Sequence, residues 1–198
     1  MDAELRTVTD RLRREAAASG ALDAYERLLA AHAADELAGV LLAAGQPLWA
    51  RELAAVKLGV LGDRRAFEAL VLLLNHRDPP RCAAAAYALA RLGDRRTARA
   101  AAALATNELR VAYALHPVRL LTELRAPESA PALIVTLQRR LTPNDPYGKV
   151  ALACVEGLGA LGDARAIPVL TAACGHPRLA AAAAAALARV SVRAQGSS

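Results

Sequence analysis

The sequence LGVLGDRRA at residues 58–66 returns as LARLGDRRT at residues 89–97 and as LGALGDARA at residues 158–166. Each copy joins two apolar stretches that have helical spacing. Self-similarity at a spacing of about thirty residues is typical of solenoids built from stacked helix pairs. The repeated stretch therefore predicts an all-α protein, a solenoid (superhelix) of antiparallel helix pairs.

The chemistry of the repeated stretch explains how one helix ends and the next begins. A glycine breaks the first helix, and the aspartate after it offers an oxygen to the bare amides at the start of the second. A fourth, degenerate copy lies at residues 124–131, where Pro131 takes the place that Pro168 has in the last copy. Proline is tolerated in the first turn of a helix, so both prolines mark helix starts. The sequence thus predicts about four repeats.

The predicted boundaries follow from these markers. We expect one domain over residues 1–198. Pro117 interrupts the third repeat, so we expect a helix to begin near His116. The spacing then lengthens, which predicts an enlarged loop within residues 138–149. The expected parts are an N-terminal helical cap (1–47), the repeats (48–178), a capping helix (179–190) and a frayed tail (191–198).

The composition favours tightly packed helices and gives little sign of chemistry. Apolar residues make up 55% of the 198 residues and aromatic residues 3%, and the formal net charge is +6. The start of the chain carries acids and no apolar core segment, and the longest apolar run, residues 179–188, is too short to span a membrane. Three cysteines without paired spacing are typical of reduced, buried thiols. We therefore expect a cytoplasmic protein without membrane insertion.

Two segments, 78–96 and 146–170, resemble the HEAT-like repeats of phycobilisome (bilin) lyases. That pattern runs Asp-Pro, Val-Arg, an alanine-rich helix, Leu-Gly-x-Leu-Gly-Asp, an arginine, and Ala-Ile-Pro-x-Leu, and it covers about residues 48–190 here. The resemblance implies a right-handed array whose junction-ending helices line the concave side. The family's arginine near the start of those helices is kept as Arg51 but is replaced by Cys82 and Ala151 in later repeats.

The helices that would line the concave side carry a predicted binding face. Residues four apart stay on one side of a helix. The face combines charges of both signs with one tyrosine, and tyrosine and arginine are favoured anchors at protein interfaces. We expect this face to bind another protein through Glu52, Tyr87, Arg91, Arg119, Glu123 and Glu156.

Two further surfaces are candidates for contact. The arginines after the junctions would align along one edge. One interpretation is that this basic edge binds phosphates or an acidic protein, and the other is that the arginines pair with acids of the neighbouring repeat. The residues are Arg64, Arg65, Arg95, Arg96 and Arg165. Aromatic residues are not interleaved with them, which makes nucleic-acid binding an unfavoured reading. The enlarged loop offers Asn144, Asp145, Tyr147 and Lys149.

Signatures of catalysis are missing from the sequence. The four histidines are isolated, no His or Cys pair has metal-site spacing, and no phosphate loop is present. We expect no metal and no cofactor. Trp49, the one tryptophan, is expected to bridge the N-terminal cap and the first repeat.

Three functions remain open at this point. The favoured one is a non-enzymatic scaffold or adaptor that binds a protein through the concave face. The first alternative is a bilin-lyase-like factor that attaches or carries a tetrapyrrole or other cofactor. The second is a DNA-binding protein that resembles the HEAT-like alkylpurine DNA glycosylases.

Overall fold

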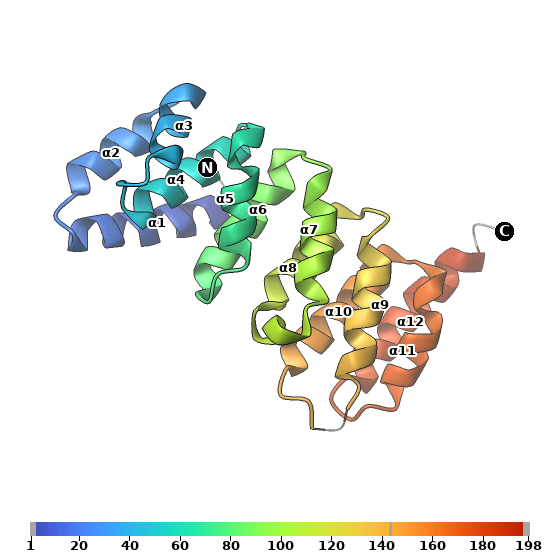
Figure 1. The fold of residues 1–198 in the computed structure, drawn as a ribbon. Coiled ribbons are helices and arrows are strands. Elements are labelled where there is room, and N and C mark those ends of the chain that lie inside the picture. The colour runs from blue at the N-terminus through green and yellow to red at the C-terminus, as the bar shows by residue number, and fades with distance from the viewer. Residues whose placement is uncertain (1–2, 143, 196–198) are drawn as a thin grey trace. The chain divides into compact units, whose positions relative to one another are not determined.

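The computed structural model describes residues 3–142 and 144–195, and within these ranges the structure contains helices and no strands (Figure 1). The all-α prediction is thereby confirmed. The α-helices are α1 (Ala3–Ala18), α2 (Leu22–Ala30), α3 (Ala34–Leu42), α4 (Leu48–Val60), α5 (Phe67–Leu74), α6 (Pro79–Leu92), α7 (Arg96–Ala105), α8 (Leu115–Leu124), α9 (Ser129–Arg140), α10 (Gly148–Leu161), α11 (Ile167–Cys174) and α12 (Ala180–Gln195). Short 3₁₀ turns are η1 (Arg64–Ala66), η2 (Glu108–Tyr113) and η3 (Ala164–Ala166).

The contacts divide the chain into two compact units, Met1–Thr97 and Ala98–Ser198. In the first unit α4 packs beside α6, α3 packs against α4, and α5 packs against both α4 and α6. Helices α1 and α2 also lie against α4, and α1 reaches α6. The one domain expected over the whole chain stays a prediction.

The second unit repeats the same neighbour order. Helix α10 lies between α8 and α12, α9 packs against α8 and α10, and α11 packs against α12 and α9. Each helix from α8 to α12 thus packs against a neighbour in the chain and against a helix next but one. This is the packing expected of successive helix pairs.

The three strong junctions share one structure. Gly62, Gly93 and Gly162 have φ values of 77°, 67° and 74°, the left-handed conformation that ends helices and that glycine adopts without a steric cost. The aspartate that follows each glycine accepts a hydrogen bond from the backbone N–H two residues later, over 2.9–3.0 Å. The predicted aspartate cap is confirmed.

The degenerate junction at residues 124–131 ends one helix and begins the next with other residues. Arg125 takes the left-handed conformation, with φ of 50°, although it is not glycine. Ser129 replaces the aspartate: its hydroxyl accepts a hydrogen bond from the Ala126 N–H over 3.1 Å and donates one to the Leu121 carbonyl over 2.6 Å. One buried hydroxyl therefore closes the end of α8 and the start of α9.

Small residues let neighbouring helices approach closely. A Cβ atom added at Gly59 in α4 would lie 2.9 Å from the Cβ of Ala88 in α6. One added at Gly159 in α10 would lie 2.8 Å from the Cβ of Ala186 in α12. The alanine-rich composition therefore serves close helix packing in both units.

The helix boundaries bear on several expectations. Helix α8 begins at Leu115 with Pro117 in its first turn, so the helix start expected near His116 is confirmed. The tail expected to fray from residue 191 is instead helical as far as Gln195, and the Arg193 guanidinium in this segment donates to the carbonyls of Ala160 and Leu161 over 3.1 and 3.3 Å. Residues 196–198 of that predicted tail, and position 143 of the predicted loop, lie outside the described residues.

Candidate functional site

Glu52 does not lie on an open face. Its side chain is 0% exposed, and its carboxylate accepts hydrogen bonds from the guanidinium groups of Arg11 in α1 and Arg81 in α6. The prediction that Glu52 contacts a partner from the surface of α4 is therefore wrong. Helix α1 covers that surface and supplies one of the two arginines that neutralise the buried charge.

Glu15 completes a cluster of two arginines and two glutamates. Its carboxylate lies 2.8 Å from Arg11 and 2.8 Å from Arg81. Burial opposes ionisation of Glu15, but the hydrogen bonds from Arg81 and Arg11 outweigh it and hold the pKa of Glu15 below its ordinary value. The cluster joins α1, α4 and α6 through charges that are largely removed from water.

A groove of about 360 Å³ runs between α1 and α6, next to this cluster. Val8 and Ala84 form part of its apolar lining, and Arg11 and Arg14 lie at its border. Tyr87 also lines the groove, although it is 9% exposed, and the Arg91 guanidinium carbon stacks 3.6 Å from the centre of the tyrosine ring. Tyr87 and Arg91, two residues of the predicted face, thus contact each other, and the tyrosine is largely covered.

The predicted face is open in the C-terminal unit. Arg119 and Glu123 of α8 are exposed, as is Glu156 of α10, the helix packed beside it. Leu152, one helical turn before Glu156, is 36% exposed. Within the part of the chain that the structure describes, Arg119 and Glu156 have no ion-pair partner. These side chains remain available to another molecule.

The junction arginines mostly bind their own aspartates. The guanidinium groups of Arg65, Arg96 and Arg165 lie 2.6–2.8 Å from the carboxylate oxygens of Asp63, Asp94 and Asp163. Hydrogen bonds from the Arg96 side chain and backbone lower the pKa of Asp94 to about 2.

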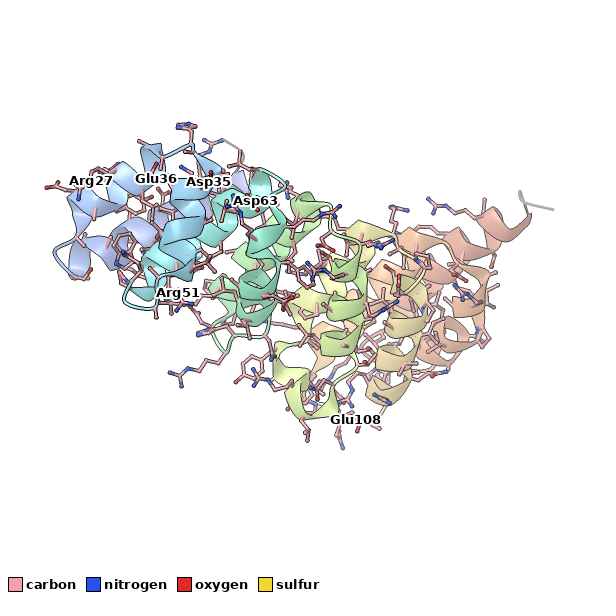
Figure 2. All side chains as sticks on the ribbon, turned by 45° about the horizontal axis from the view of Figure 1, so that its top comes forward. Arg27, Asp35, Glu36, Arg51, Asp63 and Glu108 are labelled. Carbon is pink, nitrogen blue, oxygen red and sulfur yellow. The ribbon has the colours of Figure 1, made fainter. Side chains whose placement is uncertain are left out.

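Two of these arginines also reach the preceding repeat. Arg65 lies 2.8 Å from Asp35, and Arg96 lies 3.4 Å from Glu68. Asp35 and Asp63 are labelled in Figure 2. Arg65 and Arg96 therefore pair with acids of the neighbouring repeat, which is the structural alternative given for the basic edge. Arg64 and Arg95 of that edge are exposed.

The loop before α10 is held by its own residues. Asp145 lies 3.0 Å from the Arg140 guanidinium and accepts a hydrogen bond of 2.7 Å from the Tyr147 N–H. The Asp145 side chain is 7% exposed, so it is poorly placed for the partner contact that the sequence predicted. Asn144 and Lys149 are exposed.

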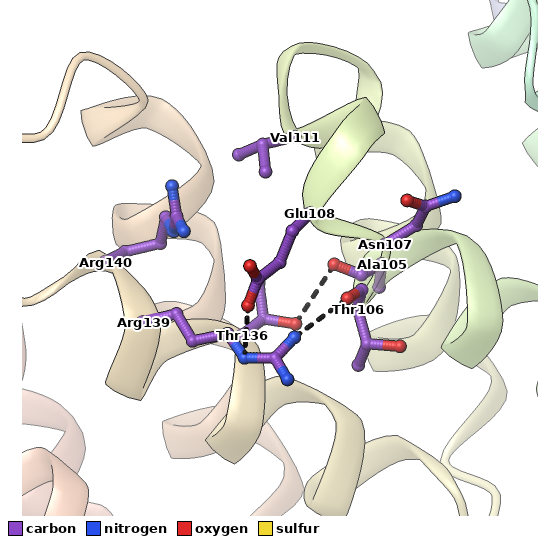
Figure 3. Close-up of a pocket in the computed structure, with 8 residues that line it drawn as sticks. All are labelled: Ala105, Thr106, Asn107, Glu108, Val111, Thr136, Arg139 and Arg140. Atoms are coloured by element: carbon purple, nitrogen blue, oxygen red, sulfur yellow. Dashed lines mark hydrogen bonds and ion pairs between the residues drawn. The ribbon is translucent and has the colours of Figure 1, made fainter.

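A small pocket lies in the C-terminal unit beside α9 (Figure 3). Arg139 closes it, pairing with Glu108 over 3.0 Å and donating to the Thr106 carbonyl over 2.9 Å. Thr136 donates to the Ala105 carbonyl over 3.2 Å. A volume of about 10 Å³ holds at most one water molecule, so these contacts are structural.

Two further side chains of α4, Trp49 and Lys57, contact the N-terminal cap. The rings of Trp49 and Tyr25 have their centres 6.2 Å apart, which confirms the bridging position expected of Trp49. The Lys57 ammonium group donates to the carbonyls of Leu28, Leu29 and Ala31, and thus caps the end of α2. Burial lowers the pKa of Lys57.

Chemistry is sparse elsewhere. Burial raises the pKa of Cys154 to about 12, so this thiol is a poor nucleophile. Across residues 3–142 and 144–195, no three His, Cys, Asp or Glu side chains gather in a metal-binding arrangement. None of the helices in those ranges is both long and apolar enough for a membrane span.

Comparisons with protein-family models and with curated proteins found no match to this chain.

The α1–α4–α6 cluster is what the sequence reasoning missed. The repeat pattern does not include α1, so it gives no position for that helix. One signal was present: Arg11 and Glu15 are four residues apart, which places them on one side of a helix. Such a pair matches the opposite charges of Glu52 and Arg81.

Proposed function

We propose that this protein is a non-enzymatic scaffold that binds another protein through the face formed by α8 and α10. The observation that carries the proposal is the exposure of Leu152 and Glu156 on α10 and of Arg119 on α8, the helix packed beside it, with neither charge in an ion pair. An apolar centre with a charged border is the usual composition of a protein interface. We further propose that the helix pairs form a right-handed solenoid of about four HEAT-like repeats.

Rigid presentation supports this function. The side chains of the face lie on helices rather than on loops, and α10 is packed on three sides by α8, α9 and α12. A preorganised surface loses little conformational entropy when it binds. In the N-terminal unit, by contrast, α1 already covers the corresponding position at Glu52.

The proposal is tested by capturing partners with the wild-type protein and with the double variant Arg119→Glu/Leu152→Glu. We expect a stoichiometric protein partner for the wild type. The affinity of the purified partner, measured by calorimetry, should fall at least about tenfold in the double variant. Leu152→Glu places a charge where an apolar side chain would be buried, and Arg119→Glu reverses the sign of a charge beside it.

The matched control is Val135→Glu, since Val135 on α9 is also 36% exposed. This variant should bind the partner as the wild type does. Equal binding by the double variant would contradict the proposal. Visible absorbance of the purified protein would favour cofactor attachment instead, and salt-sensitive retention of duplex DNA would favour nucleic-acid binding.

A further inference from the structure

Three leucine side chains of α3, α4 and α5 in the N-terminal unit are exposed, and two of them, Leu48 and Leu72, line the same depression. Leu42 at the end of α3 is 73% exposed, Leu48 at the start of α4 is 46% exposed, and Leu72 in α5 is 73% exposed. A single exposed leucine is ordinary, but a group of them around one depression marks an interaction site.

Such a depression is present. A groove of about 230 Å³ is lined by Leu48 from α4 and by Leu72 from α5, with Leu41, the neighbour of Leu42, at one side. Sites for small molecules usually enclose 300 to 1,000 Å³, as a rough range. This groove is smaller, so it suits the apolar side chain of a bound chain segment better than a whole small molecule.

The polar groups around the groove favour an acidic segment. Arg51 lines the groove and donates from Nε to the Leu41 carbonyl over 3.2 Å. No acidic side chain of the described residues pairs with it, and Figure 2 labels its position. The groove's carboxylate, Glu52, is already neutralised by Arg11 and Arg81. The unsatisfied charge at this site is therefore positive.

His76 adds a second donor. Its Nδ1 accepts a hydrogen bond of 3.0 Å from the Asp78 N–H, so the ring proton of the neutral form lies on Nε2. His76 also lines the groove. A carboxylate beside the leucines would then find an N–H from each of two cationic or donor side chains, whereas a lysine or arginine would meet only repulsion from Arg51.

From this arrangement we infer that the α3–α4–α5 groove binds an acidic amphipathic segment of another protein. A leucine, methionine or aromatic side chain of that segment enters the groove between Leu48 and Leu72, and a neighbouring carboxylate binds Arg51 and the Nε2–H of His76. This site belongs to the N-terminal unit and uses none of the α8–α10 residues, so it is independent of the proposed function.

The inference is tested by selecting binders from a random peptide library displayed on phage, with the full-length protein immobilised. We expect the enriched peptides to combine Asp or Glu with a large apolar residue. Their affinities for the protein are then measured by fluorescence anisotropy with labelled synthetic copies. Leu72→Asp and Arg51→Glu should each weaken binding at least about tenfold.

Leu109→Asp is the matched control, because Leu109 is 93% exposed but lies in the C-terminal unit. It should leave the affinity unchanged, and circular dichroism should show equal helix content in all variants. Enrichment of basic or uncharged peptides, no enrichment at all, or equal binding by Leu72→Asp would overturn the inference. So would a concentration-dependent dimer of the wild type that Leu72→Asp abolishes, because the occupant would then be a second copy of this chain.

Discussion

At the scale of the residue, the environment of Glu52 decides its role. The sequence places Glu52 in line with Val56 and Val60 on one side of a helix, and this register is that of the predicted binding face. Val56 is fully buried and Val60 is 39% exposed. Two of these three positions are thus buried, and at Glu52 one partner is Arg11 of α1, a helix that lies outside the repeat.

Replacing Glu52 with alanine should lower the free energy of unfolding by about 1 to 3 kcal/mol, because Arg11 and Arg81 would lose the one fully buried carboxylate that binds them both and would keep the more exposed Glu15. Urea denaturation followed by circular dichroism measures this. Glu156→Ala, at an exposed glutamate, should change the stability by less than about 0.5 kcal/mol. If the two variants unfold alike, the buried cluster does not stabilise the protein.

At the scale of the element, the junctions were the most predictable part of the structure. Glycine and aspartate act within a few residues of their own position, so the sequence alone was enough to place the helix ends around Gly62, Gly93 and Gly162. The end of α12 was not predictable in this way. Beyond Val190 the Arg193 guanidinium donates hydrogen bonds to the Ala160 and Leu161 carbonyls, and a contact over about thirty residues is not recorded in any local pattern.

The same substitution at two glycines should have opposite effects on stability. Gly39→Ala in α3 meets no atom within 4 Å and should raise the free energy of unfolding by about 0.5 to 1 kcal/mol, through helix propensity. Gly159→Ala would bring its Cβ to 2.9 Å from the Cα of Ala186 and should lower it by about 1 to 3 kcal/mol.

Thermal and urea unfolding of the two variants supply this comparison. A stabilising Gly159→Ala would show that α10 and α12 separate without cost. The close approach of these helices would then not be needed for the fold.

At the scale of the whole molecule, the fold class was readable from the sequence and the binding surfaces were only partly so. The periodicity of the sequence predicts helices and their order along the chain, and the structure contains helices in that order. It does not report which faces the chain covers for itself: α1 covers Glu52, whereas Arg119 and Glu156 are open. Such coverage is a long-range packing result, and it requires coordinates.

Carboxylates with lowered pKa occur in both units, so acid should destabilise the whole chain. Hydrogen bonds from Arg65, Arg96 and Arg165 lower the pKa of Asp63, Asp94 and Asp163, the value for Asp94 being about 2. Each carboxylate stabilises the fold above its unfolded pKa of about 4, and this contribution is lost as the pH falls through the folded value.

We therefore expect a nearly constant free energy of unfolding from about pH 7 to pH 5 and a decline between about pH 4 and pH 2. Urea denaturation over this range measures it. The triple variant Asp63→Asn/Asp94→Asn/Asp163→Asn should be less stable at neutral pH and should lose less in acid. An equally steep decline in the triple variant would assign the acid sensitivity to other groups.

The aspartate–arginine junction has a use in protein engineering. In each strong copy the aspartate bonds to a backbone amide and a guanidinium that both belong to the residue two positions later. The hydrogen bonds of the aspartate are thus encoded within a few consecutive residues, and the contacts of Arg65 and Arg96 with Asp35 and Glu68 are added to them from the preceding repeat. A turn whose central bonds are this local is a candidate connector for grafting between designed helices.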